Sequence, residues 1–332
     1  MHLANGDLMI ETIGNGWMWA GFVAFIGVMV AIDMLLLGRR GAHRVSAREA
    51  GAWSVVWIAL ALAFNAALWW WLDGQLGRDI ANQKALEFLT GYLVEKALAV
   101  DNIFVFVMIF SYFAVPAEYQ RRVLLYGVLG AIVLRAVMIL AGAVLIARFH
   151  WILYLFGALL VFTGLRMMLA ADHAPDLAKN PALRWMRGHL RITHDYHGDR
   201  FTVRQNGVRW FTPLFLVLVM IELSDVVFAV DSIPAIYAIT SDPFIVFTSN
   251  MFAILGLRAL YFLLADVAGR FRLLKYGLAL ILVLIGAKML LAEVYKLPIG
   301  VALGLVALIL ATSVGASLWS EGRDGRRPEE TQ

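Results

Sequence analysis

The chain has 332 residues, of which 61% are hydrophobic and 16% are charged, and its formal net charge is +4. A soluble domain has roughly 25% charged residues, so a soluble protein of this length could not bury so much apolar surface. The absence of cysteine excludes disulfides, thiolate metal sites and cysteine nucleophiles. The composition predicts a polytopic membrane protein, and the first apolar run lacks the basic region and cleavage site of a secretory signal.

About 20 apolar residues are needed to cross a bilayer, and nine runs reach this length. They cover residues 17–37, 52–72, 85–113, 123–147, 151–171, 211–240, 244–266, 273–293 and 297–319. The third and sixth runs are longer than a span requires and contain acidic residues, so we expect them to be tilted or broken. The predicted fold class is an all-α membrane protein with about nine transmembrane helices.

Lysine and arginine residues in the connections predict the orientation, because they accumulate on the cytoplasmic side. With the N-terminus outside, the inner segments hold nineteen of these residues and the outer segments four. We therefore expect a multi-pass protein of the bacterial inner (plasma) membrane, with its N-terminus outside and its C-terminus in the cytoplasm. The polar segment 172–210 then lies in the cytoplasm, and its end alternates around Asn206-Gly207 as a β-hairpin does.

An acidic motif occurs twice within the apolar runs. The second copy repeats the first at a distance of 130 residues, which aligns Glu95 with Asp225, Asp101 with Asp231 and Asn102 with Ser232. Further matches pair Leu134-Arg135-Ala136 with Leu257-Arg258-Ala259, and Gly164-Leu165-Arg166-Met167 with Gly286-Ala287-Lys288-Met289. Each unit has three spans, so the two units must insert with opposite orientations. Such an inverted 3+3 repeat is typical of transporters, whose substrate site lies near the midplane.

The chain accordingly divides into five parts. They are two N-terminal spans over 1–84, the first three-helix repeat over 85–171, the cytoplasmic basic loop with its hairpin over 172–210, the second repeat over 211–293, and the final span with the tail over 294–332.

Carboxylates within a span are costly and usually mark an ion pathway. Glu222 and Asp225 are three residues apart and share a helix face, and Ser232 is seven beyond Asp225 on the same stripe. Asp101 and Asp231 would point about 120° away on an ideal helix. Oxygen ligands alone favour Ca²⁺, Mg²⁺ or Mn²⁺, although the same acids could carry H⁺ or Na⁺. The spacing predicts a cation transporter and leaves the ion open.

Other residues near these motifs have two readings each. Pro234 frees a carbonyl beside Asp231 that could bind a cation, or it is an ordinary kink. Asp33 near the inner end of the first span is an entry ligand or a partner of the arginines that follow it. Arg135 and Arg258 occupy matching positions, where they either balance the acids and gate their protonation or form structural ion pairs.

Four stretches of the chain resemble the TerC/Alx family of integral membrane proteins. They are Glu95-Lys-Ala-Leu-Ala-Val-Asp-Asn-Ile-Phe, Phe-Ala-Val-Asp-Ser-Ile-Pro-Ala-Ile, Thr248-Ser-Asn-Met-Phe-Ala-Ile-Leu-Gly-Leu-Arg-Ala-Leu-Tyr-Phe-Leu and Leu190-Arg-Ile-Thr-His-Asp-Tyr-His-Gly. The loop and hairpin are more similar to Alx than to shorter members. The resemblance implies Mn²⁺ export within the LysE-type exporter superfamily. Carried over by position, it implies the ligands Glu95, Asp101, Asn102, Glu222, Asp225, Asp231 and Ser232.

The leading hypothesis is thus a Mn²⁺ exporter working by alternating access, with H⁺ or Na⁺ as coupling ion, no organic cofactor, no nucleic-acid partner and no enzymatic activity. The alternative is a membrane partner that delivers metal to the secretion machinery through the 172–210 loop, or a protein associated with tellurium resistance. Tellurite transport itself is disfavoured because an acidic site repels an oxyanion. An intramembrane aspartyl protease is disfavoured because the sequence has no Gly-x-Gly-Asp motif.

Overall fold

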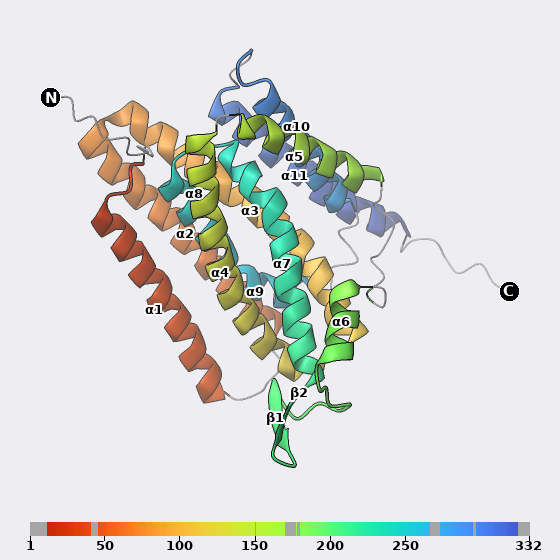
Figure 1. Ribbon diagram of the computed structural model, residues 1–332. Helices are drawn as coiled ribbons and strands as arrows, with labels where there is room; N and C mark the ends of the chain where they lie inside the picture. Colours follow the sequence, from red (N-terminus) through yellow and green to blue (C-terminus); the bar gives the residue numbers. More distant parts are fainter. Residues whose placement is uncertain are drawn as a thin grey trace.

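The computed structural model describes residues 12–40, 46–149, 151–169, 177, 180–265, 273–294 and 297–324. They form a helical bundle with one two-stranded sheet (Figure 1). The helices are α1 (Gly16–Arg40), α2 (Ala47–Leu76), α3 (Arg78–Tyr112), α4 (Ala117–Arg148), α5 (Ile152–Leu169), α6 (Pro181–His189), α7 (Pro213–Tyr237), α8 (Pro243–Leu255), α9 (Leu257–Leu264), α10 (Leu274–Leu290) and α11 (Ile299–Asp324). The strands are β1 (Thr202–Gln205) and β2 (Val208–Phe211).

Each of the nine predicted spans corresponds to one helix or, for the seventh, to the pair α8 and α9. Within the described residues, six stretches are long and apolar enough to cross a membrane. These are α2, α4, α5, α7, Pro243–Leu264 and Ile299–Ser317. The apolar part of α1, Gly16–Ile32, is shorter, and α10 has 17 residues. The all-helical fold with several membrane-length helices is confirmed, and the total of nine crossings stays a prediction.

The long acidic spans are not broken. α3 is one helix of 35 residues that begins at Arg78, and α7 is one helix of 25 residues that contains Pro234. The break falls instead at Gly256, between α8 and α9. Glycine favours such a break because it is a poor helix former, and the Lys96 ammonium fills the place of its missing side chain. Lys96 Nζ donates to the carbonyl oxygen of Ala253 at 3.4 Å, at the negative end of α8.

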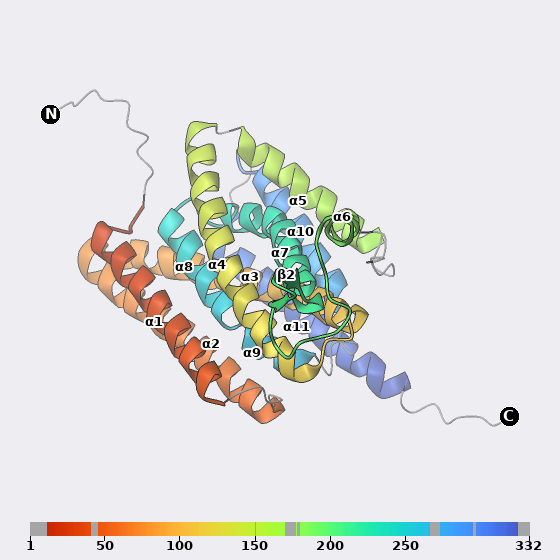
Figure 2. The same ribbon diagram turned by 60° about the horizontal axis from the view of Figure 1, so that its bottom comes forward.

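Helix α8 lies in the middle of the bundle. Every residue from Pro243 to Leu255 is buried, and α8 packs against α1, α2, α3 and α4. Figure 2 shows it between the α1–α2 pair and α4. Its neighbours are largely aromatic, with Phe22, Phe64 and Phe88 all within ring-contact distance of Phe252. A helix that is apolar on all sides belongs in a core, so the polar residues that α8 does carry are held inside the protein.

Helices α5 and α10 lie side by side in both views, and their glycines permit a close approach (Figures 1 and 2). A Cβ on Gly164 would lie 2.7 Å from the carbonyl oxygen of Ala279, and a Cβ on Gly286 would lie 2.7 Å from that of Gly157. Gly164 and Gly286 are the aligned positions of the predicted repeat, 122 residues apart. The two glycines therefore occupy equivalent places in the packing. Small residues at helix contacts are the usual means of close packing in membranes.

Substitution of these glycines should loosen the pair. Gly164→Ala is expected to lower the free energy of unfolding by about 1–3 kcal/mol, because the added methyl group meets backbone atoms that cannot move aside. Gly304→Ala in α11 is the matched control, since a Cβ there has no neighbour within 4 Å. Alanine is the better helix former, so this control should be neutral or slightly stabilising. Thermal unfolding of both purified variants tests this, and equal melting temperatures would contradict it.

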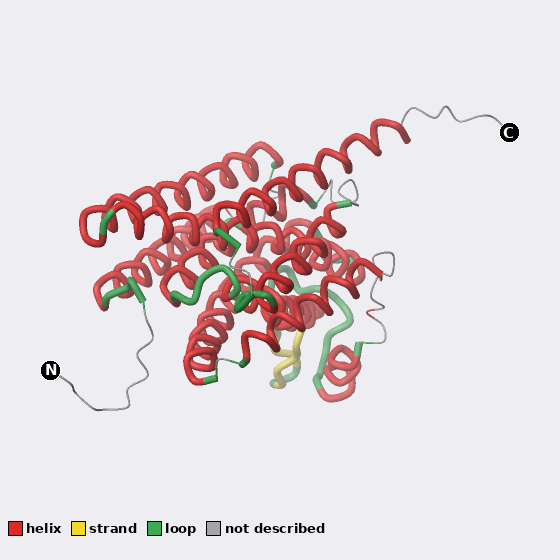
Figure 3. The backbone as a smooth tube through the Cα atoms, turned by 90° about the horizontal axis from the view of Figure 1, so that it is seen from above, coloured by secondary structure: helices red, strands yellow, loops and turns green. Residues whose placement is uncertain are grey.

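The predicted hairpin is confirmed, and together with α6 it covers one end of the bundle (Figures 1 and 3). Thr202 pairs with Phe211 and Gln205 with Val208, in antiparallel register. Asn206 and Gly207 have φ angles of 51° and 81°, the left-handed pair that a type I′ turn requires. Residues 172–176, 178 and 179 of the predicted polar segment lie outside the described residues.

Candidate functional site

Arg135 of α4 is 2% exposed and joins polar groups from three other helices. Its guanidinium forms an ion pair with the carboxylate of Glu95 in α3, which is fully buried. Its Nη1 also donates to Ser232 Oγ in α7 at 3.2 Å and to Asn250 Oδ1 in α8 at 3.3 Å. A desolvated charge is tolerated only with such partners. The result is a buried group of oxygen acceptors around one cation.

A second buried contact joins the same two motif helices. Asn102 Nδ2 in α3 donates to Asp225 Oδ1 in α7 at 3.5 Å, and each residue is 1% exposed. One turn earlier in α7, the partly buried Glu222 interacts electrostatically with Asp225. The Glu222 carboxylate fills the space beside Gly130 of α4, where any side chain would collide with it. Gly130 therefore admits a third acid to this region.

The two contacts are equivalent under the 130-residue repeat. The shift takes Asn102 to Ser232 and Glu95 to Asp225, so the Asn102–Asp225 contact corresponds to Ser232 and Glu95. The latter pair does not bond directly; Arg135 bonds to both and bridges them. We call Glu95, Asn102, Asp225, Ser232, Asn250 and Arg135 the central group. It consists of two half-sites, each of which links α3 to α7.

Asp101 and Asp231 lie apart from the central group. Thr163 Oγ1 of α5 donates to Asp231 Oδ1 at 3.0 Å, and Arg166 of α5 interacts electrostatically with the same carboxylate. Asp101 interacts with Lys275 of α10. The two acids are thus turned toward the α5–α10 pair, each toward a helix of the other unit. We call them the peripheral pair, and their orientation agrees with the 120° offset predicted for a straight helix.

The seven predicted ligands are therefore divided between two places. Four of them belong to the central group: Glu95, Asn102, Asp225 and Ser232. Glu222 lies beside this group, and Asp101 and Asp231 form the peripheral pair. Within the described part of the chain, no three His, Cys, Asp or Glu side chains lie close enough to hold one metal ion. In this conformation, the seven predicted ligands therefore do not surround a single ion position. The central group instead offers mixed carboxylate, amide and hydroxyl oxygens.

The remaining predicted residues are placed as follows. Pro234 lies in the last turn of α7, which stays helical. Arg258 lies in the first turn of α9, directly after the Gly256 break, and is partly buried. Asp33 lies in α1, but its side chain is outside the described part of the structure.

Sequence reasoning missed Asn250, which provides an acceptor to Arg135. A signal was present, because Thr248-Ser249-Asn250 places three polar residues in a row within an otherwise apolar span. Thr163 was also missed, and nothing in its local sequence distinguishes it from the hydroxyls that bond their own helix. Asn250 Nδ2 and Asn102 Oδ1 are buried without a hydrogen-bond partner. Buried polar atoms usually have partners, so these two atoms could contact a further polar group or ligand.

A further polar network lies at the end of the bundle where α3 begins. Thr240 Oγ1 donates to Glu87 Oε2 at 2.6 Å, and Lys84 Nζ lies 2.8 Å from the same oxygen and 3.8 Å from Asp242 Oδ2. Thr12 Oγ1 donates to Asp242 Oδ1 at 2.8 Å. We call Lys84, Glu87, Thr240 and Asp242 the end network. It ties α3 of the first unit to the turn between α7 and α8 of the second.

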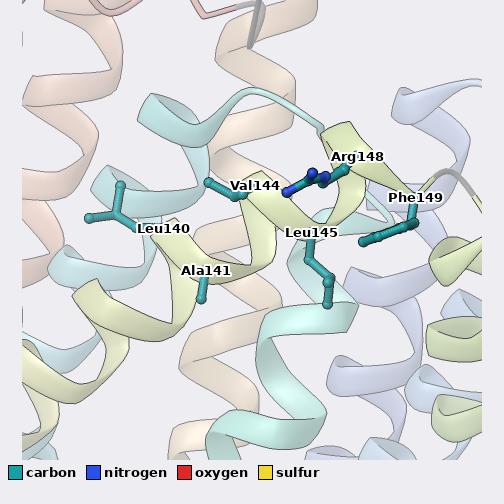
Figure 4. Close-up of a pocket in the computed structure, with 6 residues that line it drawn as sticks. All are labelled: Leu140, Ala141, Val144, Leu145, Arg148 and Phe149. Carbon is teal, nitrogen blue, oxygen red and sulfur yellow. The ribbon is translucent and has the colours of Figure 1, made fainter. Parts of the chain in front are cut away.

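The surface cavity drawn in Figure 4 is separate from these groups. It measures about 460 Å³ and lies along the last turns of α4. Its lining residues are Leu140, Ala141, Val144, Leu145, Arg148 and Phe149. Its described lining residues offer no carboxylate or amide oxygen from a side chain, so they do not suit a cation site.

Comparison with known proteins places this architecture in a family. Residues 80–325 match the model of the integral membrane protein TerC family. The chain is 57% identical over 318 residues to Alx of Escherichia coli (strain K12), which carries the provisional description "membrane-bound redox modulator". That alignment covers 96% of this chain and 99% of the relative. A membrane protein of Myxococcus xanthus is 45% identical over 307 residues, covering 92% of this chain and 93% of the relative. No solved structure matches.

Proposed function

The chain belongs to the TerC family of integral membrane proteins, and on this premise we propose that it exports Mn²⁺ from the cytoplasm. The observation that carries the proposal is the central group, which places carboxylate, amide and hydroxyl oxygens from both units inside a membrane-length bundle. Acids at such depth are costly, and they mark ion pathways. A donor set made only of oxygen favours a hard divalent cation.

Arg135 gives the central group its positive charge when no cargo ion is present. Its guanidinium contacts acceptor oxygens of Glu95, Ser232 and Asn250, and these are the same oxygens that a metal ion would use. Cargo binding then requires Arg135 to withdraw from at least part of this set. We propose that this exchange of one cation for another keeps the acids neutralised throughout transport, which lowers the energy of the empty carrier.

The proposed transport mechanism is alternating access of two inverted units of three spans each. These are α3–α5 and α7–α10, in which α8 and α9 together form one span. Three sets of contacts support it, because each maps onto its counterpart when the units are exchanged. They are the two half-sites of the central group, the peripheral pair facing α10 and α5, and the two glycines at the α5–α10 contact. α3 likewise packs on α8 as α7 packs on α4. Equivalent units that exchange conformations would present the site to opposite sides in turn.

The end network is the proposed outer gate in this scheme. It closes the end at which α3 begins, which the distribution of basic residues predicts to be outside the cell. Its links between the two units are the hydrogen bond from Thr240 to Glu87 and the ion pair of Lys84 with Asp242. Such contacts can be replaced by water when the units move apart, whereas a packed apolar seam cannot. The peripheral pair is available to carry the coupling ion, H⁺ or Na⁺.

Uptake of ⁵⁴Mn²⁺ into inside-out membrane vesicles tests the proposal. Wild-type vesicles should accumulate Mn²⁺ above vesicles without the protein. Asp101→Asn and Asp231→Asn should each lower the rate about tenfold or more, because each removes a charge that interacts with the other unit. Asp195→Asn, an equal change in an exposed loop, should leave the rate unchanged. No uptake by wild type, or equal rates in all variants, would reject the exporter.

The metal-delivery alternative also has one observation in its favour. Residues 180–212 form an ordered structure rather than a loose loop. It contains α6 and the hairpin, and backbone hydrogen bonds join Arg191 and Thr193, which follow α6, to Phe211 of β2. Such a surface could receive a partner of the secretion machinery. If wild-type vesicles move no Mn²⁺ while the purified protein still binds it, this alternative replaces the exporter.

A further inference from the structure

Residues 180–212, which we call the cap, are fixed firmly to one end of the bundle (Figure 1). Asn180 caps α6 by accepting from the backbone amide of Ala182 at 2.9 Å, and Leu183 and Met186 are buried against the helix ends. Burial raises the pKa of the Tyr196 hydroxyl, which donates to the carbonyl oxygen of Phe113 at 2.7 Å. The cap is therefore able to hold a preformed site.

A cavity of about 850 Å³ lies between the cap and the adjoining ends of α3 and α7. The lining residues that matter here are Tyr112, Arg187, Arg191, His194, Trp210 and Leu216. Two arginines and one histidine line it, and none of its described lining residues is a carboxylate. Its volume falls within the range of small-ligand sites. This cavity is separate from both the central group and the end network.

No acid within the described part of the chain forms an ion pair with the arginines of this cavity, Arg187 and Arg191. Asp199, an acid of the cap, is already taken by Arg122 of α4, whose Nη1 lies 2.7 Å from its carboxylate. Two guanidinium groups beside one cavity repel each other, and an anion between them removes that repulsion.

We propose that this cavity binds a phosphate-bearing anion. Guanidinium groups bind phosphate through paired, charge-assisted hydrogen bonds, which suits two arginines that share one cavity. The aromatic rings of Tyr112 and Trp210 offer contact for the organic part of such a ligand. The cavity adjoins the ends of membrane-length helices, where basic pockets bind anionic lipid headgroups. A soluble phosphate compound has the same chemistry, so the probes must separate the two sources.

Native mass spectrometry and calorimetry of the delipidated full-length protein provide the test. The first titration uses phosphatidylglycerol with phosphatidylcholine as the uncharged comparison, and the second uses inorganic pyrophosphate. Arg187→Gln/Arg191→Gln should weaken binding of the active probe about tenfold or more, because it removes the bidentate donors. Arg184→Gln/Arg200→Gln is the matched control. It changes one arginine in α6 and one in the following loop, neither of which lines the cavity.

A charge-preserving variant separates phosphate recognition from simple attraction and from misfolding. Arg187→Lys/Arg191→Lys keeps both charges but loses the planar fork, so its affinity should fall between wild type and the Gln variant. Binding of phosphatidylglycerol alone assigns the site to lipid, and binding of pyrophosphate assigns it to a soluble ligand. The proposal is overturned if neither probe binds wild type. It is equally overturned if the control pair weakens binding as much as the cavity pair does.

Discussion

Glu95→Gln is expected to lower the free energy of unfolding by about 3–5 kcal/mol, because it leaves the charge of Arg135 buried without its carboxylate. The exposed fraction is 0% for Glu95 and 2% for Arg135, so solvent cannot take the place of the lost carboxylate. Ser232 and Asn250 still accept hydrogen bonds from the guanidinium, but neither carries charge. Equilibrium unfolding in mixed detergent micelles measures the change.

The double variant Glu95→Gln/Arg135→Gln shows whether the charge imbalance is the cause. Without the arginine, the buried guanidinium that lacked its carboxylate is gone, although Asp225 loses its interaction with that cation. The amide introduced at position 135 can still donate to Ser232 or Asn250. The double variant should therefore be more stable than Glu95→Gln alone, which is a positive coupling energy between the two positions. Glu118→Gln on the exposed start of α4 should cost less than about 1 kcal/mol. Additive losses in the double variant would show that Arg135 and Glu95 do not act as a pair.

The double variant should recover stability relative to Glu95→Gln without recovering transport. The double variant recovers stability, but it has lost one proposed ligand and the cation that neutralises the empty site. Its ⁵⁴Mn²⁺ uptake should stay as low as that of Glu95→Gln. Recovery of uptake together with stability would mean that the pair is structural only, which is the second reading that the sequence left open for Arg135.

The features of the fold that the sequence predicts are those set by local chemistry. Apolar runs long enough for a bilayer became helices, since backbone groups in lipid must bond internally. Asn206-Gly207 became a type I′ turn because those two residues tolerate positive φ. The repeat aligned Gly164 with Gly286, and the structure gives these two glycines equivalent places in the packing of α5 on α10.

The features that the sequence does not predict depend on partners far along the chain. The break at Gly256 coincides with an ammonium group supplied by Lys96, which is 160 residues away. The early start of α3 brings Glu87 against Thr240, and no local pattern indicates that bond. Likewise, Asn250 becomes a partner of Arg135 only once α8 is buried in the middle of the bundle. A single sequence does not show which residues far apart in the chain will contact each other.

The candidate site could be predicted in part from the sequence. Helical periodicity placed Glu95 with Asn102 and Asp225 with Ser232, and it turned Asp101 and Asp231 away from them. Periodicity along one helix could not say what each face would meet. The structure supplies that information: one face meets the opposite motif and Arg135, and the other meets α5 or α10. Helices α3 and α7 therefore each carry motif residues on two faces, and these two faces need not have the same function.

Mn²⁺ binding to purified protein should distinguish the faces. Asp225→Asn is expected to weaken binding about 10- to 100-fold, since it removes a charged ligand from the buried central group. Asp231→Asn makes the same chemical change on the same helix, but its carboxylate faces Thr163 and Arg166. It should leave Mn²⁺ affinity within about threefold of wild type, because an acid outside the site contributes only a screened interaction.

Asp101, the equivalent residue in the first unit, provides an independent check. Asp101→Asn should reproduce the behaviour of Asp231→Asn, with near-normal Mn²⁺ affinity and slow transport, since the two residues are equivalent under the repeat. If Asp101 and Asp231 were needed for binding while Asp225 was not, the cargo site would lie between α3, α7 and the α5–α10 pair. The central group would then be a structural ion-pair cluster. A result in which binding follows Asp225 and transport follows all three acids would assign cargo to the centre and coupling to the periphery.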